Sequence, residues 1–174
     1  EKGEAAGVHP IYRLDRNTTG LVLVAKSSKV QHDLSKSHDR IYREYVALAS
    51  GVFPEKEGMV DAPIGRKDGS IIEWTVRPEG KPARTDYRVL QQMEDFALLR
   101  LHLHTGRTHQ IRVHMAHIHH PLLGDDLYGT ADSRIDRQAL HAEMIRFIHP
   151  ETGEEMEFHA PIPADMLFWK GDKA

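Results

Sequence analysis

Residues 8–26 read V-H-P-I-Y-R-L-D-R-N-T-T-G-L-V-L-V-A-K, and the rest of the chain is interpreted around this segment. Its last part, residues 21–25, is an unbroken run of strand-forming apolar side chains, which predicts a short buried strand. The polar residues 15–20 that precede the run have the composition of a turn. Asp15 is therefore expected on a loop attached to a sheet, with the cationic Arg13 close by. Such a carboxylate is a candidate nucleophile or base, unless it only ties the turn together through backbone hydrogen bonds.

The composition is typical of one folded domain. The chain has 174 residues, of which 40% are hydrophobic and 28% are charged, enough for a single core. It contains no cysteine, which excludes a disulfide framework and a thiolate metal site. It also has no apolar run of 18 residues and nothing like a signal peptide at its beginning, so we expect a cytoplasmic protein that does not span a membrane.

The charges are unevenly distributed along the chain. The formal net charge is −3, which does not suggest a general nucleic-acid binder. Residues 9–45, however, contain seven Lys or Arg against four Asp or Glu. Residues 100–120 contain three Arg, seven His and no acidic residue. Two basic segments in an acidic molecule predict one face that binds an anion, the alternative being charges that merely alternate over a solvated surface.

The first third of the chain predicts a helix followed by a strand. Ser27 and Ser28 are both favourable N-caps for a helix over roughly residues 28–38. Residues 41–50 alternate as a strand does, which places Tyr45 on one face and Val46 on the other. Tyr45 would then share its face with a neighbouring arginine and alanine of the same strand.

The middle of the chain predicts an antiparallel hairpin. Residues 84–91 and 97–104 both read as strands, and the few residues between them are too short for a parallel crossover. Every second residue from Leu99 to Leu103 is expected to face the core, with arginine and histidine side chains between them facing out. Shorter elements are predicted as strands at residues 71–76 and 154–159 and as a helical turn within residues 163–170.

A second helix is predicted after the hairpin. It would begin with Thr108 as its cap and run to about residue 117, with Ile111, Met115 and Ile118 forming its apolar stripe. Residues 138–149 fit a strand or a helix equally well by pattern. Together the elements predict an α+β fold, with a mixed, mainly antiparallel sheet flanked by a few helices and loops.

Seven histidines between residues 102 and 120 form a separate candidate site. The spacing His114-x-x-His117 is compatible with metal binding. No acidic residue lies nearby before Asp125, and no H-E-x-x-H pair is present. Histidines in this pattern are more typical of surface or stacking positions than of metal ligands.

Ordered sequence blocks resemble the RluA-like branch of the pseudouridine synthases. Residues 13–20 (R-L-D-R-N-T-T-G) resemble its H-R-L-D-x-x-T-[ST]-G signature, with Tyr12 in place of the usual histidine. The other matching blocks are residues 43–47 (R-E-Y-V-A), 81–87 (K-P-A-R-T-D-Y), 106–114 (G-R-T-H-Q-I-R-V-H), 120–125 (H-P-L-L-G-D) and 140–142 (L-H-A).

The resemblance also bears on fold and extent. It implies that residues 1–174 form a single catalytic domain of the α+β type, and it favours a strand at residues 138–149. Members of the family normally have a strand and a K-P-[AS]-G loop upstream, and some carry an S4-type RNA-binding domain. The chain starts after that point, so we expect it to lack both.

The resemblance assigns roles to particular residues. Asp15 matches the essential carboxylate, Arg112 the arginine that pairs with it, and Tyr45 the tyrosine that stacks on the target base and whose hydroxyl has been proposed to move a proton. The residues expected to hold RNA are Arg13, which would occupy the space of the displaced base, and Arg107, His109 and Gln110, which would contact the backbone near the start of the helix.

The activity that the resemblance implies is the isomerisation of a specific uridine in structured ribosomal or transfer RNA to pseudouridine. The C1′–N1 bond breaks, the uracil turns and a C1′–C5 bond forms, so no metal or other cofactor is required. The protein would act as a monomer. Two alternatives remain: a catalytically inactive RNA-binding module, and a metal-dependent hydrolase built on the histidine cluster.

Overall fold

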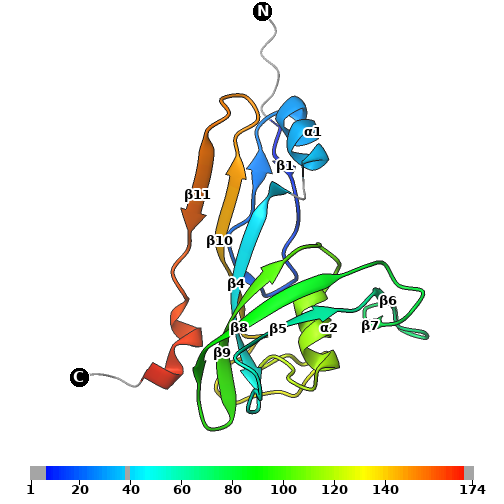
Figure 1. Ribbon diagram of the computed structural model, residues 1–174, viewed down its shortest axis with the longest axis vertical. Coiled ribbons are helices and arrows are strands. Elements are labelled where there is room, and N and C mark those ends of the chain that lie inside the picture. Colours follow the sequence, from blue (N-terminus) through cyan, green and yellow to red (C-terminus); the bar gives the residue numbers. More distant parts are fainter. Residues whose placement is uncertain (1–6, 38–39, 171–174) are drawn as a thin grey trace, which may run out of the picture.

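The protein is built on one long mixed sheet whose strands are paired mainly in antiparallel fashion (Figure 1). The computed structural model describes residues 7–37 and 40–170. The sheet runs in the order β11 (Glu155–His159), β10 (Leu140–Ile148), β4 (Tyr42–Ser50), β9 (Phe96–Leu103), β8 (Arg84–Gln92) and β5 (Glu57–Asp61), and β2 (Thr19–Gly20) pairs in parallel with β10.

The remaining elements lie around this sheet. Two small hairpin-like pairs are formed by β1 (His9–Pro10) with β3 (Val24–Ala25) and by β6 (Ile64–Arg66) with β7 (Trp74–Val76). The helical elements are α1 (Ser28–Lys36), α2 (Gln110–His117) and two 3₁₀ turns, η2 (Ala164–Met166) and η3 (Phe168–Lys170). The predicted α+β class is confirmed.

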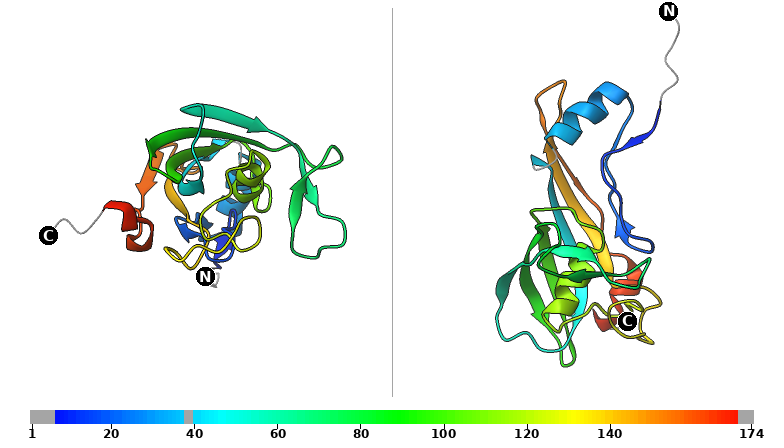
Figure 2. Two further views of the ribbon diagram at one scale, coloured as in Figure 1. Left: turned by 90° about the horizontal axis from the view of Figure 1, so that it is seen from below. Right: turned by 90° about the vertical axis from the view of Figure 1, so that its right-hand side faces the viewer.

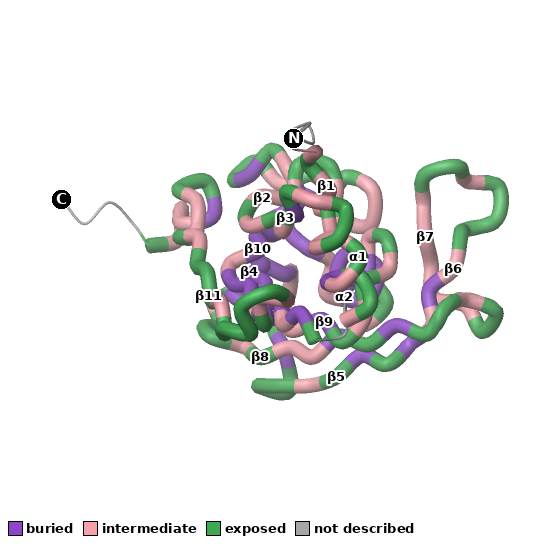
Figure 3. The backbone as a smooth tube through the Cα atoms, turned by 90° about the horizontal axis from the view of Figure 1, so that it is seen from above, coloured by how far each residue is buried: buried purple, intermediate pink, exposed green. Residues whose placement is uncertain are grey.

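The alternation of β4 separates two parts of the core. Tyr45 and Ala47 point to the face that α2 covers with Ile111 and Met115. Val46 and its alternate neighbours point to the other face, which the C-terminal 3₁₀ turns cover. Figure 3 shows the buried backbone gathered along β4 and β10. This confirms the predicted assignment of Tyr45 and Val46 to opposite faces and places the tyrosine ring beside α2.

The predicted hairpin is confirmed. β8 and β9 pair antiparallel, with a register shift between Val89 and Gln91. Leu99 and Leu101 are fully buried and Leu103 nearly so, as the alternation predicted. The predicted strand at residues 138–149 is β10, and the turn expected at the C-terminal end is the pair η2 and η3.

Two predicted strands are shorter than expected. Of residues 21–25 only Val24–Ala25 is a strand, and Val22 and Val24 are each 45% exposed. The chain leaves β10 after Leu21, whose N–H donates to the Ala142 carbonyl, and meets the segment of β1 at Leu23, whose carbonyl accepts from Ile11. The run therefore changes partners partway and does not form one continuous strand. Of residues 71–76 only Trp74–Val76 is a strand, because Ile71 and the residues beside it form the exposed tip of the β6–β7 hairpin.

The β6–β7 hairpin projects from the body of the molecule in Figures 2 and 3. Val113 of α2 packs against its base, together with Ile64 and Trp74. The helix is therefore enclosed by the sheet on one side and the hairpin base on another, and its residues 110–115 are all buried. The predicted apolar stripe of α2 covered only the side of the helix that faces the sheet, and it did not include the side that faces the hairpin base.

Both helices begin close to the predicted positions. The hydroxyl of Ser27 accepts a hydrogen bond from the Val30 N–H at 3.2 Å, which confirms it as the N-cap of α1. The helix ends at Lys36, and position 38 of the predicted range lies outside the described residues. The N-cap of α2 is His109 in a left-handed conformation with φ of 56°, so the prediction of Thr108 as cap was wrong. No helix among residues 7–37 and 40–170 is long and apolar enough to cross a lipid bilayer.

Candidate active site

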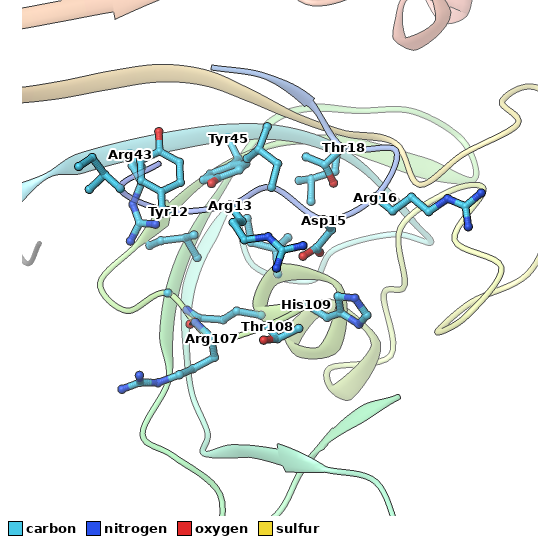
Figure 4. A pocket seen from close by; sticks show the side chains of 17 residues that line it. Tyr12, Arg13, Asp15, Arg16, Thr18, Arg43, Tyr45, Arg107, Thr108 and His109 are labelled. Atoms are coloured by element: carbon cyan, nitrogen blue, oxygen red, sulfur yellow. The ribbon is translucent and has the colours of Figure 1, made fainter. Parts of the chain in front are cut away.

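A cavity of about 580 Å³ opens between the loop of residues 11–18, the strand β4 and the loop that leads into α2 (Figure 4). Among the described residues, Asp15 is the one carboxylate on its walls. Its cationic lining residues are Arg13, Arg16, Arg43 and Arg107, joined by His109. All five of these residues come from the two predicted basic segments, which confirms that the segments border the same hollow. That this face binds an anion stays a prediction.

Asp15 presents its carboxylate to the cavity. The backbone carbonyl of Asp15 closes the turn by accepting from the Thr18 N–H at 3.0 Å, so the turn does not need the side chain. The carboxylate instead lies close enough to His109 for the two residues to interact electrostatically. Burial raises the pKa of Asp15, although the nearby His109 and Arg112 act in the opposite direction. A partly desolvated carboxylate that faces a cavity, 21% exposed, is a candidate functional group.

The loop that carries Asp15 is held by residues about 120 positions away. The buried amide of Gln138 donates to the Arg16 carbonyl at 2.6 Å and to the Thr18 hydroxyl at 3.1 Å. Arg137 donates to the carbonyl of Asn17, which has φ of 68°. Gln138 and Arg137 were not predicted from sequence, since neither lies in a recognised block.

The same loop is anchored again where β2 meets β10. The Thr19 hydroxyl lies 2.9 Å from Nδ1 of His141, whose other ring nitrogen lies 3.1 Å from the Ala160 carbonyl. Gly20, with φ of 110°, lies directly against Ala142. Only a residue without a side chain fits there, which explains the glycine at the end of the turn.

The predicted pairing of Arg112 with Asp15 needs one correction, which concerns the main partner of the arginine. Its guanidinium fork binds Asp125, with Nε to Oδ2 at 2.7 Å and Nη2 to Oδ1 at 2.8 Å. Nη1 lies 4.0 Å from Oδ2 of Asp15. The family resemblance therefore placed Arg112 beside Asp15 correctly but did not indicate its main partner, Asp125. Asp125 lies in the matched block H-P-L-L-G-D, which was a signal that could have identified it.

Tyr45 and Arg43 form the wall of the cavity that β4 supplies. Tyr45 is 5% exposed, and burial raises the pKa of its hydroxyl, which therefore stays protonated near neutral pH. Figure 4 shows the Tyr45 ring and the Asp15 carboxylate on the same side of the hollow. Arg43 lies over the ring of Tyr12 at 5.0 Å, and its Nε is buried without a hydrogen-bond partner among the described residues. Arg43 was not among the predicted site residues.

His109 and Tyr128 link the cavity to the β6–β7 hairpin. Nδ1 of His109 lies 2.7 Å from the Tyr128 hydroxyl, which also accepts from the Trp74 N–H at 2.9 Å. The ring of Tyr128 lies 5.0 Å from the guanidinium carbon of Arg112. Burial lowers the pKa of His109, so a neutral imidazole is favoured near pH 7. Tyr128 is a further site residue that the sequence did not single out.

The remaining predicted RNA contacts separate into two groups. Arg13 is exposed at the cavity rim, and Arg107 donates to the Pro82 carbonyl at 2.8 Å while pointing away from Asp15 (Figure 4). Gln110 is only 3% exposed. Its amide oxygen accepts a hydrogen bond from the Thr105 hydroxyl at 2.7 Å, and its amide nitrogen donates to the backbone of β8. This side chain shapes the loop from inside, so the structure does not favour the direct RNA contact predicted for Gln110.

The histidine cluster is dispersed over separate partners. His114 is buried between the Thr85 hydroxyl and the Ala62 carbonyl, whereas His104 pairs with Asp86. Within residues 7–37 and 40–170, no three His, Asp or Glu side chains are arranged to hold a metal ion. Nothing in this part of the chain supports the hydrolase alternative.

Comparison with known proteins identifies the family. Residues 1–117 match the family model described as RNA pseudouridylate synthase. A Bacillus subtilis protein named "Uncharacterized RNA pseudouridine synthase YjbO" is 50% identical over 94% of this chain and 59% of its own length. An Escherichia coli protein named "Ribosomal large subunit pseudouridine synthase D" is 48% identical over 90% of this chain and 53% of its own length. The chain belongs to the RNA pseudouridylate synthase family.

Solved structures support the same assignment. The protein named "Human RNA Pseudouridylate Synthase Domain Containing 1" superposes with a TM-score of 0.78 at 28% identity, covering 89% of this chain and 69% of that protein. A second human protein, "RNA Pseudouridylate Synthase Domain Containing 4", shares the fold with a TM-score of 0.75 at 23% identity, over 95% of this chain and 76% of that protein. The chain spans little more than half the length of the two bacterial relatives.

Proposed function

We propose that this protein is an RNA pseudouridine synthase that isomerises a specific uridine, with ribosomal RNA as the preferred substrate class and transfer RNA as the second. The observation that carries the proposal is the position of Asp15, a partly buried carboxylate in a basic cavity with Tyr45 on the β4 wall and Arg112 behind it. The Escherichia coli relative's name supports ribosomal RNA.

The cavity satisfies the physical demands of the reaction. The C1′–N1 bond must break and a C1′–C5 bond must form on the same uracil, so the base has to leave its stack and enter a pocket. Asp15 is the carboxylate that acts on the nucleoside there, by attack on C1′ or C6 or by removal of the 2′ proton. The reaction moves no electrons to an acceptor, and we propose that it requires no metal or cofactor.

Tyr45 supplies the surface on which the uracil rests. Its ring lines the cavity on the side of β4, and aromatic rings stack on any unstacked base. Because burial raises the pKa of the hydroxyl, Tyr45 would act as a hydrogen-bond donor rather than as a phenolate. The uracil would then turn between this ring and the carboxylate of Asp15.

The arginines would hold the RNA around the extruded nucleotide. Arg13, which is exposed and lines the cavity, would fill the gap that the uridine leaves in the RNA helix. Arg107 and His109 would contact phosphates near the start of α2, where backbone N–H groups favour anions. We propose further that residues 1–174 form one catalytic domain that acts in the cytoplasm. The described residues that line the cavity all belong to this chain, which supports a monomer.

The decisive experiment measures pseudouridine formation by the purified protein on unmodified large-subunit ribosomal RNA and transfer RNA, both transcribed in vitro. Asp15→Asn should abolish tritium release from C5-labelled uridine while RNA binding persists. Asp126→Asn is the matched control, because it removes an exposed carboxylate outside the cavity and should leave the rate unchanged. Substantial turnover by Asp15→Asn would refute the assigned role, and RNA binding without any turnover by the unaltered protein would favour an inactive RNA-binding module.

A further inference from the structure

A second carboxylate, Asp125, lies fully buried behind the candidate catalytic pair. Its Oδ2 accepts from Nε of Arg112 at 2.7 Å, and its Oδ1 accepts from Nη2 at 2.8 Å. Oδ1 also accepts from the backbone N–H groups of Leu127 and Tyr128, each at 3.1 Å. Its backbone is fixed as well, since its carbonyl accepts from Gly129 at 3.0 Å. Asp125 is therefore a rigid acceptor and cannot follow Arg112 if the arginine moves.

We propose that Asp125 is a positioning residue for the isomerisation, which holds the guanidinium of Arg112 so that only its Nη1 edge faces Asp15. The inference rests on the proposed function of this site. An arginine fork and a carboxylate prefer two parallel hydrogen bonds. Without Asp125, Arg112 would make that bidentate pair with Asp15 and would occupy the oxygens that must act on the nucleoside.

The observed distances fit this division of roles. Arg112 makes two short hydrogen bonds to Asp125 but stands 4.0 Å from the nearest oxygen of Asp15. The guanidinium is held from another side by the ring of Tyr128, 5.0 Å away. At that separation Arg112 offsets the charge of Asp15 and fixes its direction without covering it. The arrangement leaves the oxygens of Asp15 accessible from the cavity while a positive charge lies close to them.

The charge of Asp125 also acts on Asp15. One guanidinium between two carboxylates leaves a net negative charge, so Asp125 opposes the ionisation of Asp15 in addition to the effect of burial. Replacing Asp125 by a neutral residue should therefore make Asp15 easier to ionise. The other charged and titratable groups that face Asp15 or line the same cavity are Arg13 and Arg16 from its own loop, Arg43 and Tyr45 from β4, His109 and Arg112 from α2 and its cap, and Tyr128.

The test compares Asp125→Asn and Asp125→Glu with the unaltered protein in single-turnover assays on unmodified large-subunit ribosomal RNA, from acid to neutral pH. Asp125→Asn should lower the rate by up to about 100-fold, the cost of roughly a 1 Å misplacement, while RNA affinity stays the same. It should also move the acid limb of the pH–rate profile to lower pH. Asp125→Glu keeps the charge but displaces the fork, so the rate should fall with the acid limb in place.

Each outcome decides the question. A folded Asp125→Asn protein with an unchanged rate, or with a lower rate and an unmoved acid limb, would show that Asp125 is only structural. If Asp125→Asn does not fold, Asp125→Glu decides: a reduced rate at unchanged RNA affinity supports the proposal, and an unaltered rate overturns it. If the unaltered protein forms no pseudouridine, the proposed function itself fails, and this inference fails with it.

Discussion

Gly20 is the point at which the loop carrying Asp15 is pressed against the sheet, and Gly20→Ala is the most direct perturbation of that contact. A Cβ atom at this position would lie 2.6 Å from the Ala142 nitrogen, whereas ordinary contacts begin at 3.4 Å. The neighbour is backbone of the central strand β10, which cannot yield as a flexible side chain would. The loop must therefore retreat from β10 by at least about 0.8 Å, the difference between those two distances.

The expected loss of folding stability in Gly20→Ala has two parts. A side chain at positive φ costs about 1–2 kcal/mol, and overpacking against β10 adds about 1–3 kcal/mol. Gly153→Ala is the matched control, because Gly153 has φ of 74° but open space around it. The control should show only the first cost, which is a fall in Tm of a few degrees for a domain of this size.

Calorimetry and single-turnover kinetics on the same samples separate the two effects. Gly20→Ala should lower Tm further than Gly153→Ala does. It should also reduce the rate by up to about 100-fold, since a retreat of nearly 1 Å carries Asp15 away from the nucleoside. Gly153→Ala should leave the rate unchanged. Equal Tm shifts and equal rates in the two variants would refute the conclusion that contact between β2 and β10 positions Asp15.

Three further outcomes are expected. Asp15→Asn should raise Tm at pH 7. Burial raises the pKa of Asp15 above its value in the unfolded chain, so the ionised carboxylate destabilises the folded state. The gain in Tm should vanish in acid, where the carboxyl is protonated in both the folded and the unfolded state. Gln138→Ala should lower the single-turnover rate without weakening RNA binding, whereas the exposed Gln91→Ala should change neither. Arg13→Ala should lower kcat/KM and leave Tm unchanged. It should also reduce the dependence of RNA affinity on salt, measured by fluorescence anisotropy. The control Arg88→Ala should change neither kcat/KM nor the salt dependence, because Arg88 lies outside the cavity.

Some features of the site followed from sequence because they depend on local order along the chain. The period-two alternation of β4 was enough to place Tyr45 and Val46 on opposite faces. The turn before Leu21 was enough to place Asp15 on a loop. The strand expected after that turn was too long, because its pairing depends on whether β10 and β1 lie alongside, which the apolar run itself does not specify.

The sequence by itself determined the α+β class, the loop that presents Asp15 and the face on which Tyr45 lies, since each of these depends on residues within a few positions of one another. Only the tertiary structure decided that Arg112 binds Asp125 in preference to Asp15, that Gln138 holds the loop carrying Asp15, and that Gln110 is buried. Those contacts join residues that are distant in sequence and are brought together by packing. The sequence cannot show that Arg112 lies 2.7 Å from an oxygen of Asp125 but 4.0 Å from the nearest oxygen of Asp15.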